Sequence, residues 1–224
     1  MSSSPFIPLG PAHNLALNLE MNAPSPPLKR VGVFFATREG HTQRIAERIG
    51  ADLRKLGFDV DIVSVCRPIP FSLANYSAAV LAASVHQGNH EVEMVQFVKA
   101  HRPELERMTT AFLSVTLSEA RAERKDATPE EHARFVKDVD KMLDNFFYET
   151  KWLPTIAKPI AGALLYTRYN FLVRFIMRCI AKKAGGELDT SRDYVYTDWV
   201  ELDKFAEKLA GGIREAPVME AILS

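Results

Sequence analysis

The fold is decided by the stretch VGVFFATREGHT, which occupies residues 31–42. Its first half, Val31–Ala36, is short and continuously apolar, as expected for a buried strand. Its second half, Thr37–Thr42, contains two threonines and a glycine, and an amphipathic helix follows it directly. A strand that turns straight into a helix directs several backbone N–H groups and the positive helix end at one point. The stretch therefore predicts a binding site for a phosphate monoester.

Apolar runs alternate with helical patterns along the rest of the chain. The first helix ends at Gly57, and Thr128 followed by Pro129 is a typical helix start. This alternation predicts a doubly wound parallel sheet of five strands in the order 2-1-3-4-5, with ligand bound where the strand order reverses. Further strands are expected at 59–65, 78–83, 110–117 and 159–165, and further helices at 92–101, 129–147, 166–184 and 199–209.

Length and composition suit one domain of ordinary size. We divide the chain into a disordered extension with six prolines at 1–28, a domain at 29–212 and a tail at 213–224. The formal net charge of zero does not support nucleic-acid binding. Cys66 and Cys179 are expected to be reduced, no metal-ligand spacing is found, and no apolar run is long enough to span a bilayer.

The predicted helix 166–184 has an unusual charge pattern. No acidic residue occurs between Thr150 and Gly186, whereas seven lysines or arginines do. An amphipathic basic helix of this kind is expected to lie on an anionic membrane surface without crossing it. The alternative is a helix that covers the sheet and has a solvated basic edge. The basic side comprises Arg174, Arg178 and Lys182, and the apolar side Leu172, Phe175, Ile176, Cys179 and Ile180.

The Thr-x-x-Gly-x-Thr pattern of residues 37–42 resembles that of flavodoxins and their FMN-binding relatives. It lacks the three glycines of a dinucleotide fingerprint and the Gly-Lys-Ser/Thr of a Walker loop. The fold class expected is therefore α/β and flavodoxin-like, with FMN as cofactor. A plain strand-to-helix turn is the alternative interpretation.

Two further loops are expected beside this first loop, at the carboxyl ends of the third and fourth strands. The second loop, Ala83–His90, is small and polar and suits a backbone that lines a flavin ring. His86 and His90 are candidates for hydrogen bonds to flavin or substrate, with solvated histidines as the alternative. The third loop, Ser114–Ala120, would cover the other side of the flavin. The charged stretch Glu119–Glu131 is expected to be a solvated loop or a substrate lid.

Several blocks together resemble the bacterial quinone-dependent protoporphyrinogen oxidases, a family of flavodoxin-fold enzymes of haem synthesis. The resemblance covers roughly residues 31–209. It rests on TREGHT at 37–42, ASVHQG at 83–88, SVTL at 114–117, IAGAL at 160–164 and, most specifically, GGELDT at 185–190 with VYTDW at 195–199. The sequence departs from the family pattern at His86-Gln87, where other members have Arg-Tyr.

The resemblance implies an enzyme that uses FMN to oxidise protoporphyrinogen IX in two-electron steps and passes the electrons to a quinone. It implies a peripheral membrane protein on the cytoplasmic face, or a mitochondrial one in a eukaryote. An NAD(P)H:quinone reductase and a flavodoxin-type electron carrier are the alternatives, and a homo-oligomer stays open. His86 is the candidate catalytic residue. The candidate cofactor-binding residues are Thr37, Arg38, Glu39, Gly40, His41, Thr42, Ser84, Val85, His86, Gln87, Gly88, Ser114, Val115, Thr116 and Leu117.

Overall fold

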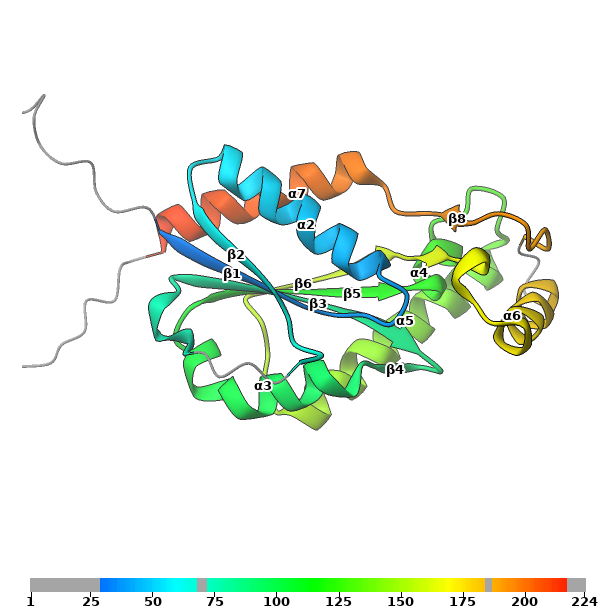
Figure 1. Cartoon of the computed structure of the whole chain (residues 1–224), viewed down its shortest axis with the longest axis horizontal. Coiled ribbons are helices and arrows are strands. Elements are labelled where there is room, and N and C mark those ends of the chain that lie inside the picture. Colours follow the sequence, from blue (N-terminus) through cyan, green and yellow to red (C-terminus); the bar gives the residue numbers. More distant parts are fainter. Residues whose placement is uncertain (1–28, 68–71, 184–186, 217–224) are drawn as a thin grey trace, which may run out of the picture.

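A computed structural model describes residues 29–67, 72–183 and 187–216 of the chain. Its centre is a parallel sheet whose second strand along the chain lies at one edge (Figure 1). Counted along the chain, the parallel strands have the order 2-1-3-4-5, which confirms the predicted topology. In sheet order they are β2 (Asp59–Ser64), β1 (Arg30–Ala36), β3 (Ala78–His86), β5 (Thr109–Thr116) and β6 (Ile156–Ala161).

Helices cover both faces of the sheet, as Figure 1 shows. On one face lie α2 (His41–Lys55) and α7 (Trp199–Glu215). On the other lie α3 (Val92–Leu105) and α5 (Pro129–Thr150), while a short turn, η1 (Leu73–Asn75), precedes β3. This two-sided cover explains why the central strands are apolar on both faces.

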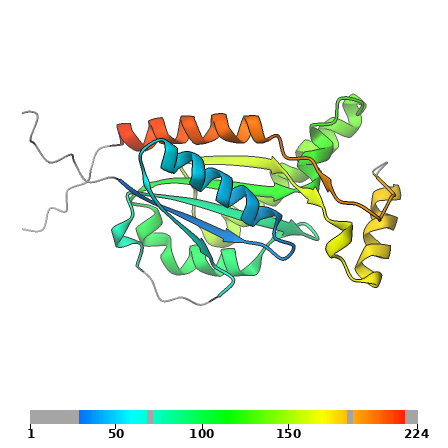
Figure 2. The ribbon, with the colours of Figure 1, turned by 45° about the horizontal axis from the view of Figure 1, so that its top comes forward.

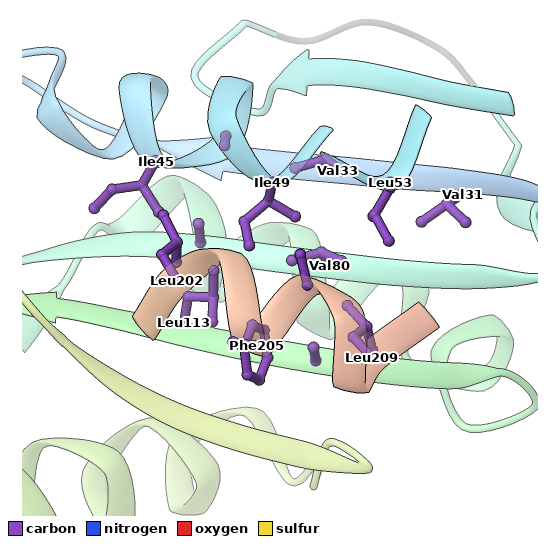
Figure 3. Packing of buried hydrophobic residues seen from close by; sticks show 14 of the residues in the cluster. Val31, Val33, Ile45, Ile49, Leu53, Val80, Leu113, Leu202, Phe205 and Leu209 are labelled. Atoms are coloured by element: carbon purple, nitrogen blue, oxygen red, sulfur yellow. The ribbon is translucent and has the colours of Figure 1, made fainter. Parts of the chain in front are cut away.

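The core between α2, α7 and the sheet is built from side chains at helical spacing (Figure 3). Ile45, Ile49 and Leu53 of α2 meet Leu202, Phe205 and Leu209 of α7 above Val31, Val33 and Val80 of the strands. Val33 is in register with Val80, so neighbouring strands present one continuous apolar surface. Removing a buried aromatic ring from such a core costs about 3–5 kcal/mol.

The predicted start of α5 is confirmed in detail. The Thr128 hydroxyl accepts a hydrogen bond from the Glu131 amide at 3.2 Å, and the Glu131 carboxylate accepts one from the Thr128 amide at 3.0 Å. This reciprocal capping box and Pro129 at the first turn fix the helix start. Asp198 caps α7 in a similar way, accepting hydrogen bonds from the amides of Val200 and Glu201.

The predicted fifth strand, 159–165, is wrong at its carboxyl end. β6 ends at Ala161, and the next residues form a separate strand, β7 (Ala163–Leu164), which pairs antiparallel with β8 (Tyr194–Val195). The chain leaves the main sheet because β5 also ends here. The Gly162 amide makes a last hydrogen bond to the Thr116 carbonyl, and the Gly162 carbonyl accepts one from the Tyr196 amide.

The predicted helix 166–184 is interrupted. It begins as a 3₁₀ turn, η2 (Tyr166–Arg168), and the α-helix proper is α6 (Phe171–Lys183). The Arg174 guanidinium donates hydrogen bonds to the carbonyls of Tyr166 and Tyr169 at 3.0 and 3.1 Å and so caps the turn. Figure 2 shows that α6 stands beyond the carboxyl ends of the strands, away from the helices that cover the sheet. The sheet-covering alternative for this helix is therefore wrong.

Three other boundaries differ from the predictions. The charged stretch after β5 begins as a helix, α4 (Leu117–Ala122), so only residues 123–128 connect it to α5. α7 continues to Glu215 because its apolar spacing extends to the buried Ile213, so the domain boundary expected at 212 falls inside a helix. The predicted extension 1–28, the expected end of the helix at residue 184 and most of the predicted tail lie outside the described residues.

Candidate active site

A cleft of about 550 Å³ opens at the carboxyl edge of the sheet, where the strand order reverses between β1 and β3. We call it the loop cleft, because the three predicted loops meet there. Every predicted cofactor-binding residue lines it except Gly40 and Ser114. Residues outside the predicted set also line it, namely Ser118, Arg121, Met142, Gly162, Ala163, Leu165, Tyr169, Ile176 and Met177.

The first loop is organised around the start of α2. The Thr37 hydroxyl accepts a hydrogen bond from the Gly40 amide at 3.0 Å. Gly40 has φ +86°, which glycine adopts without strain, and a Cβ there would lie 2.8 Å from Arg168 Nη1. Within the described ranges, no side chain caps the start of α2. The first N–H groups of the helix are therefore open to an anion.

Two buried polar atoms at this helix start have no hydrogen-bond partner among the described residues. They are the Thr42 hydroxyl oxygen and His41 Nδ1. The Thr197 hydroxyl donates to the Ala161 carbonyl at 2.6 Å, so it accepts from His41 Nε2 at 2.7 Å. His41 is thus the Nε2–H tautomer, and its bare Nδ1 is a hydrogen-bond acceptor. Both orphaned atoms are suited to the phosphate and hydroxyl groups of a bound nucleotide.

His41 is neutral at physiological pH. Burial, followed by the charges of Arg44 and Arg168, lowers the pKa of His41 to about 4. The positive charge at this end of the loop cleft comes instead from Arg168 in η2, whose Nη1 donates to the Glu39 carbonyl at 2.6 Å. The sequence analysis missed Arg168, although it lies in the segment without acidic residues, because the whole segment was assigned to one helix.

The second loop is a hairpin rather than a loop. β3 extends to His86, and a tight turn with positive φ at Gln87 and Gly88 leads into β4 (Asn89–His90). His90 pairs with Val85 and not with His86, so the two histidines lie on opposite faces of the hairpin.

His90 packs into the core and does not line the loop cleft. Its ring lies against Phe112 and Phe146, its Nε2 is 2.9 Å from the Ser114 hydroxyl, and burial lowers the pKa of His90 to about 4. The interpretations of His90 as a flavin contact or as a solvated histidine are both wrong. The same hydrogen bond explains why Ser114 faces away from the loop cleft.

His86 lies between two carboxylates. Its Nε2 is 3.0 Å from Glu91 Oε1 and 3.3 Å from Glu39 Oε2. Hydrogen bonding to Glu39 and then to Glu91 raises the pKa of His86 to about 9. At neutral pH it is therefore a cation that holds a proton, which suits a donor or a fixed positive charge and not a general base.

Glu91 joins the first two loops. Its side chain is 2% exposed and also accepts hydrogen bonds from Arg38 Nε at 2.9 Å and the Ser84 hydroxyl at 3.0 Å. Burial alone would raise the pKa of Glu91, but these bonds and His86 lower it. Arg38, a predicted cofactor-binding residue, lines the loop cleft and also pairs with this carboxylate. The buried carboxylate thus fixes the spacing of the two loops.

The third loop contributes the end of β5 and the start of α4. The Thr116 hydroxyl accepts a hydrogen bond from the Ser118 amide at 3.1 Å, which caps α4 and turns Leu117 and Ser118 toward the loop cleft. Tyr169 closes the opposite side, and burial raises its pKa to about 12, so the phenol is neutral. The described residues include no group of three or more side chains that could hold a metal ion.

The fold and the loop cleft together define a class of protein. The family model described as flavodoxin domain matches residues 32–191, well over half of the chain. Among solved structures, oxidised flavodoxin 1 from Bacillus cereus is 12% identical, covers 84% of this chain and 100% of its own, and superposes with a TM-score of 0.46. The match to a flavodoxin domain indicates that the chain binds a flavin.

Two relatives are closer in sequence. Protoporphyrinogen IX dehydrogenase (quinone) from Escherichia coli strain K12 is 34% identical over 178 residues, which are 80% of this chain and 93% of that protein. Its namesake from Leishmania major is 32% identical over 179 residues, which are 80% of this chain and 73% of that protein. The chain therefore belongs to the protoporphyrinogen IX dehydrogenase (quinone) family of flavodoxin-domain proteins, which confirms the resemblance found in the sequence.

Proposed function

We propose that this protein is an FMN-dependent oxidoreductase that converts protoporphyrinogen IX to protoporphyrin IX and passes the electrons to a quinone. The observation that carries the proposal is the pair of orphaned atoms, Thr42 Oγ1 and His41 Nδ1, at the uncapped start of α2. The names of the relatives supply the substrate and the acceptor. When bound, the flavin accepts electrons in pairs from one reactant and returns them to another.

The residues of the chain favour FMN over a larger flavin nucleotide. A terminal phosphate fits the open N–H groups of α2, the Thr42 hydroxyl and the charge of Arg168. A hydroxyl of the ribityl chain of the flavin could donate a hydrogen bond to the acceptor Nδ1 of His41. The bound flavin can be released by heat and compared with FMN and FAD standards by chromatography. We expect it to elute with FMN.

His86 and its carboxylates position charge at the ring end of the loop cleft. The protonated imidazole balances part of the negative charge of Glu39 and Glu91 beside the loop cleft. Its N–H holds a proton at neutral pH. His86, the candidate catalytic residue, therefore does not act as the base toward the porphyrinogen at neutral pH, and another group or solvent takes that proton.

We also propose that α6 holds the protein on an anionic membrane surface, where a lipid-soluble quinone is found. Among the described residues no helix is long and apolar enough to cross a bilayer. However, Phe171, Leu172 and Phe175 are 86%, 64% and 59% exposed on α6, and Arg178 is exposed beside them. Met177 of the same helix lines the loop cleft, so a membrane under α6 would lie close to the flavin. Arg174 does not join this surface, because it caps η2.

Turnover tests the proposed reaction. Purified protein loaded with flavin is mixed with protoporphyrinogen IX and a soluble quinone under strict exclusion of air, and the appearance of porphyrin fluorescence is followed. We expect porphyrin formation that requires both protein and quinone. Rapid reduction of the quinone by NADPH, without porphyrin formation, would instead favour the NAD(P)H:quinone reductase alternative.

A further inference from the structure

A second cavity of about 470 Å³ adjoins the loop cleft. It lies between α4, α6 and the β7–β8 pair, which gather at the same end of the molecule (Figure 1). Leu117, Arg121 and Met177 line both spaces, so the two are contiguous. We call it the arginine cavity, because Arg121 and Arg124 supply its positive charge while Leu117, Leu164, Met177 and Ala181 supply apolar walls.

Arg121 is a half-buried cation without a counter-ion. Among the described residues its guanidinium has no hydrogen bond and no carboxylate at salt-bridge distance, and its one recorded contact is with the Phe135 ring, at 5.6 Å. Burial lowers the pKa of Arg121 most. Tyr196 and Glu187 act in the opposite direction, and the charges of Arg124 and Arg134 lower the pKa further. A charge that is removed from water and left unpaired is costly, and an anionic ligand would offset that cost.

The other charged groups of the arginine cavity already have partners. Arg124 pairs with Asp126 through two short contacts, of 2.9 and 2.5 Å. On the opposite wall the Tyr196 hydroxyl donates to the Glu187 carboxylate, and the Tyr166 hydroxyl donates to the Glu187 carbonyl at 2.8 Å. The Glu187 carboxylate is thus hydrogen-bonded to Tyr196; its charge acts on Arg121, but among the described residues the two side chains form no salt bridge.

We propose that the arginine cavity binds the porphyrinogen substrate, with one propionate carboxylate on Arg121 and the macrocycle reaching into the loop cleft. The inference rests on the proposed function and adds the place and the anchor of the substrate. The volume lies within the range of small-molecule sites, and apolar walls with one convergent cation match an apolar macrocycle that carries carboxylates. A quinone has no charge that would need Arg121.

The test compares two ligands with the same macrocycle, one with charged propionates and one with neutral methyl esters. Equilibrium binding of protoporphyrin IX and of its dimethyl ester is measured by fluorescence with the flavin-loaded protein. The variants are Arg121→Met, Arg121→Lys and, as a control, Arg102→Met, which removes an arginine from the exposed surface of α3. A charge-assisted pair predicts that Arg121→Met weakens binding of the acid about tenfold to a hundredfold and leaves binding of the ester unchanged. Arg121→Lys should restore part of the loss.

Three results would overturn the assignment. Acid binding within about twofold of wild type in Arg121→Met would show that Arg121 is no anchor. An equal loss for acid and ester would assign Arg121 a packing role, and loss of flavin from Arg121→Met would assign it to the cofactor. If the wild-type protein binds neither porphyrin, the proposed function itself fails. If wild type turns over porphyrinogen and Arg121→Met binds the acid as well as wild type does, the proposed function stands and only the proposed position of the substrate is rejected.

Discussion

α7 and α6 contain similar apolar residues at helical spacing, yet their surroundings are opposite. Leu202, Phe205 and Leu209 of α7 are buried against α2 and the sheet, whereas Phe171 and Phe175 of α6 are mostly exposed beyond the carboxyl edge. In the first region apolar side chains stabilise the fold. In the second they are largely uncovered by the part of the chain that the structure describes, so they are available to a partner. Apolar side chains of the same kind thus form the core at α7 and an exposed surface at α6.

The largest expected effect separates the two helices by stability. Phe205→Ala should lower the free energy of unfolding by about 3–5 kcal/mol, because it leaves a cavity in a packed core. Phe175→Ala should change it by less than about 0.5 kcal/mol, since the ring is 59% exposed. Urea unfolding of both variants measures the difference. Equal losses would mean that α6 is packed as firmly as α7.

For membrane binding, changes on α6 should matter although they barely affect stability. Phe171→Ser with Phe175→Ser should weaken sedimentation with anionic vesicles at least about tenfold, because burial of each ring contributes about 1.5–3 kcal/mol. Leu153→Ser is the matched control, since Leu153 is 75% exposed at the amino end of β6, away from α6. Binding should also weaken with salt. Wild-type protein that stays in the supernatant at low salt would contradict the membrane proposal.

Flavin affinity should depend on the first loop and not on the exposed phenylalanines of α6. Thr42→Val removes the orphaned hydroxyl but keeps the shape of the side chain, and it should weaken FMN binding about tenfold to a hundredfold. Thr42→Ser, which keeps the hydroxyl, should bind nearly as well as wild type, and so should the α6 double variant. Titration of the apoprotein with FMN measures all of these. Unchanged affinity in Thr42→Val would remove the first loop from the site.

The smallest expected effect concerns pH. The pKa of His86 in the folded protein, about 9, lies above its ordinary value of 6.5. The ion pairs of His86 therefore contribute fully to the free energy of unfolding below about pH 6.5, and this contribution is lost as pH rises through about 9. Because His86 is partly exposed, the free energy of unfolding of wild type should exceed that of His86→Gln by only about 1–2 kcal/mol at pH 6. Urea unfolding at pH 6 and pH 10 should show this gap closing, and a gap independent of pH would contradict it.

Sequence patterns predicted the features that local chemistry decides. The apolar run of β1, the turn with Gly40, the apolar spacing of α2 and the cap at Thr128 are all written within a few neighbouring residues. The strand order followed, since right-handed crossovers leave few arrangements. The predicted site residues then met in one cleft for the same reason.

Distant pairings were not predictable in this way. Strands of two residues such as β7 and β8 have no periodic pattern, and Arg168 reaches the first loop across 129 positions. The opposite directions of His86 and His90 depend on the register of a hairpin that was assigned as a loop. The unpaired state of Arg121 is visible only when all of its neighbours are known.

A single-turnover experiment tests the central claim most directly. Flavin-loaded protein is mixed with protoporphyrinogen IX under anaerobic conditions without any quinone, and the visible absorbance of the oxidised flavin is followed. We predict that the absorbance bleaches as porphyrin fluorescence appears, and that added quinone restores it. A flavin that stays oxidised in the presence of porphyrinogen, yet bleaches at once with NADPH, would contradict the account.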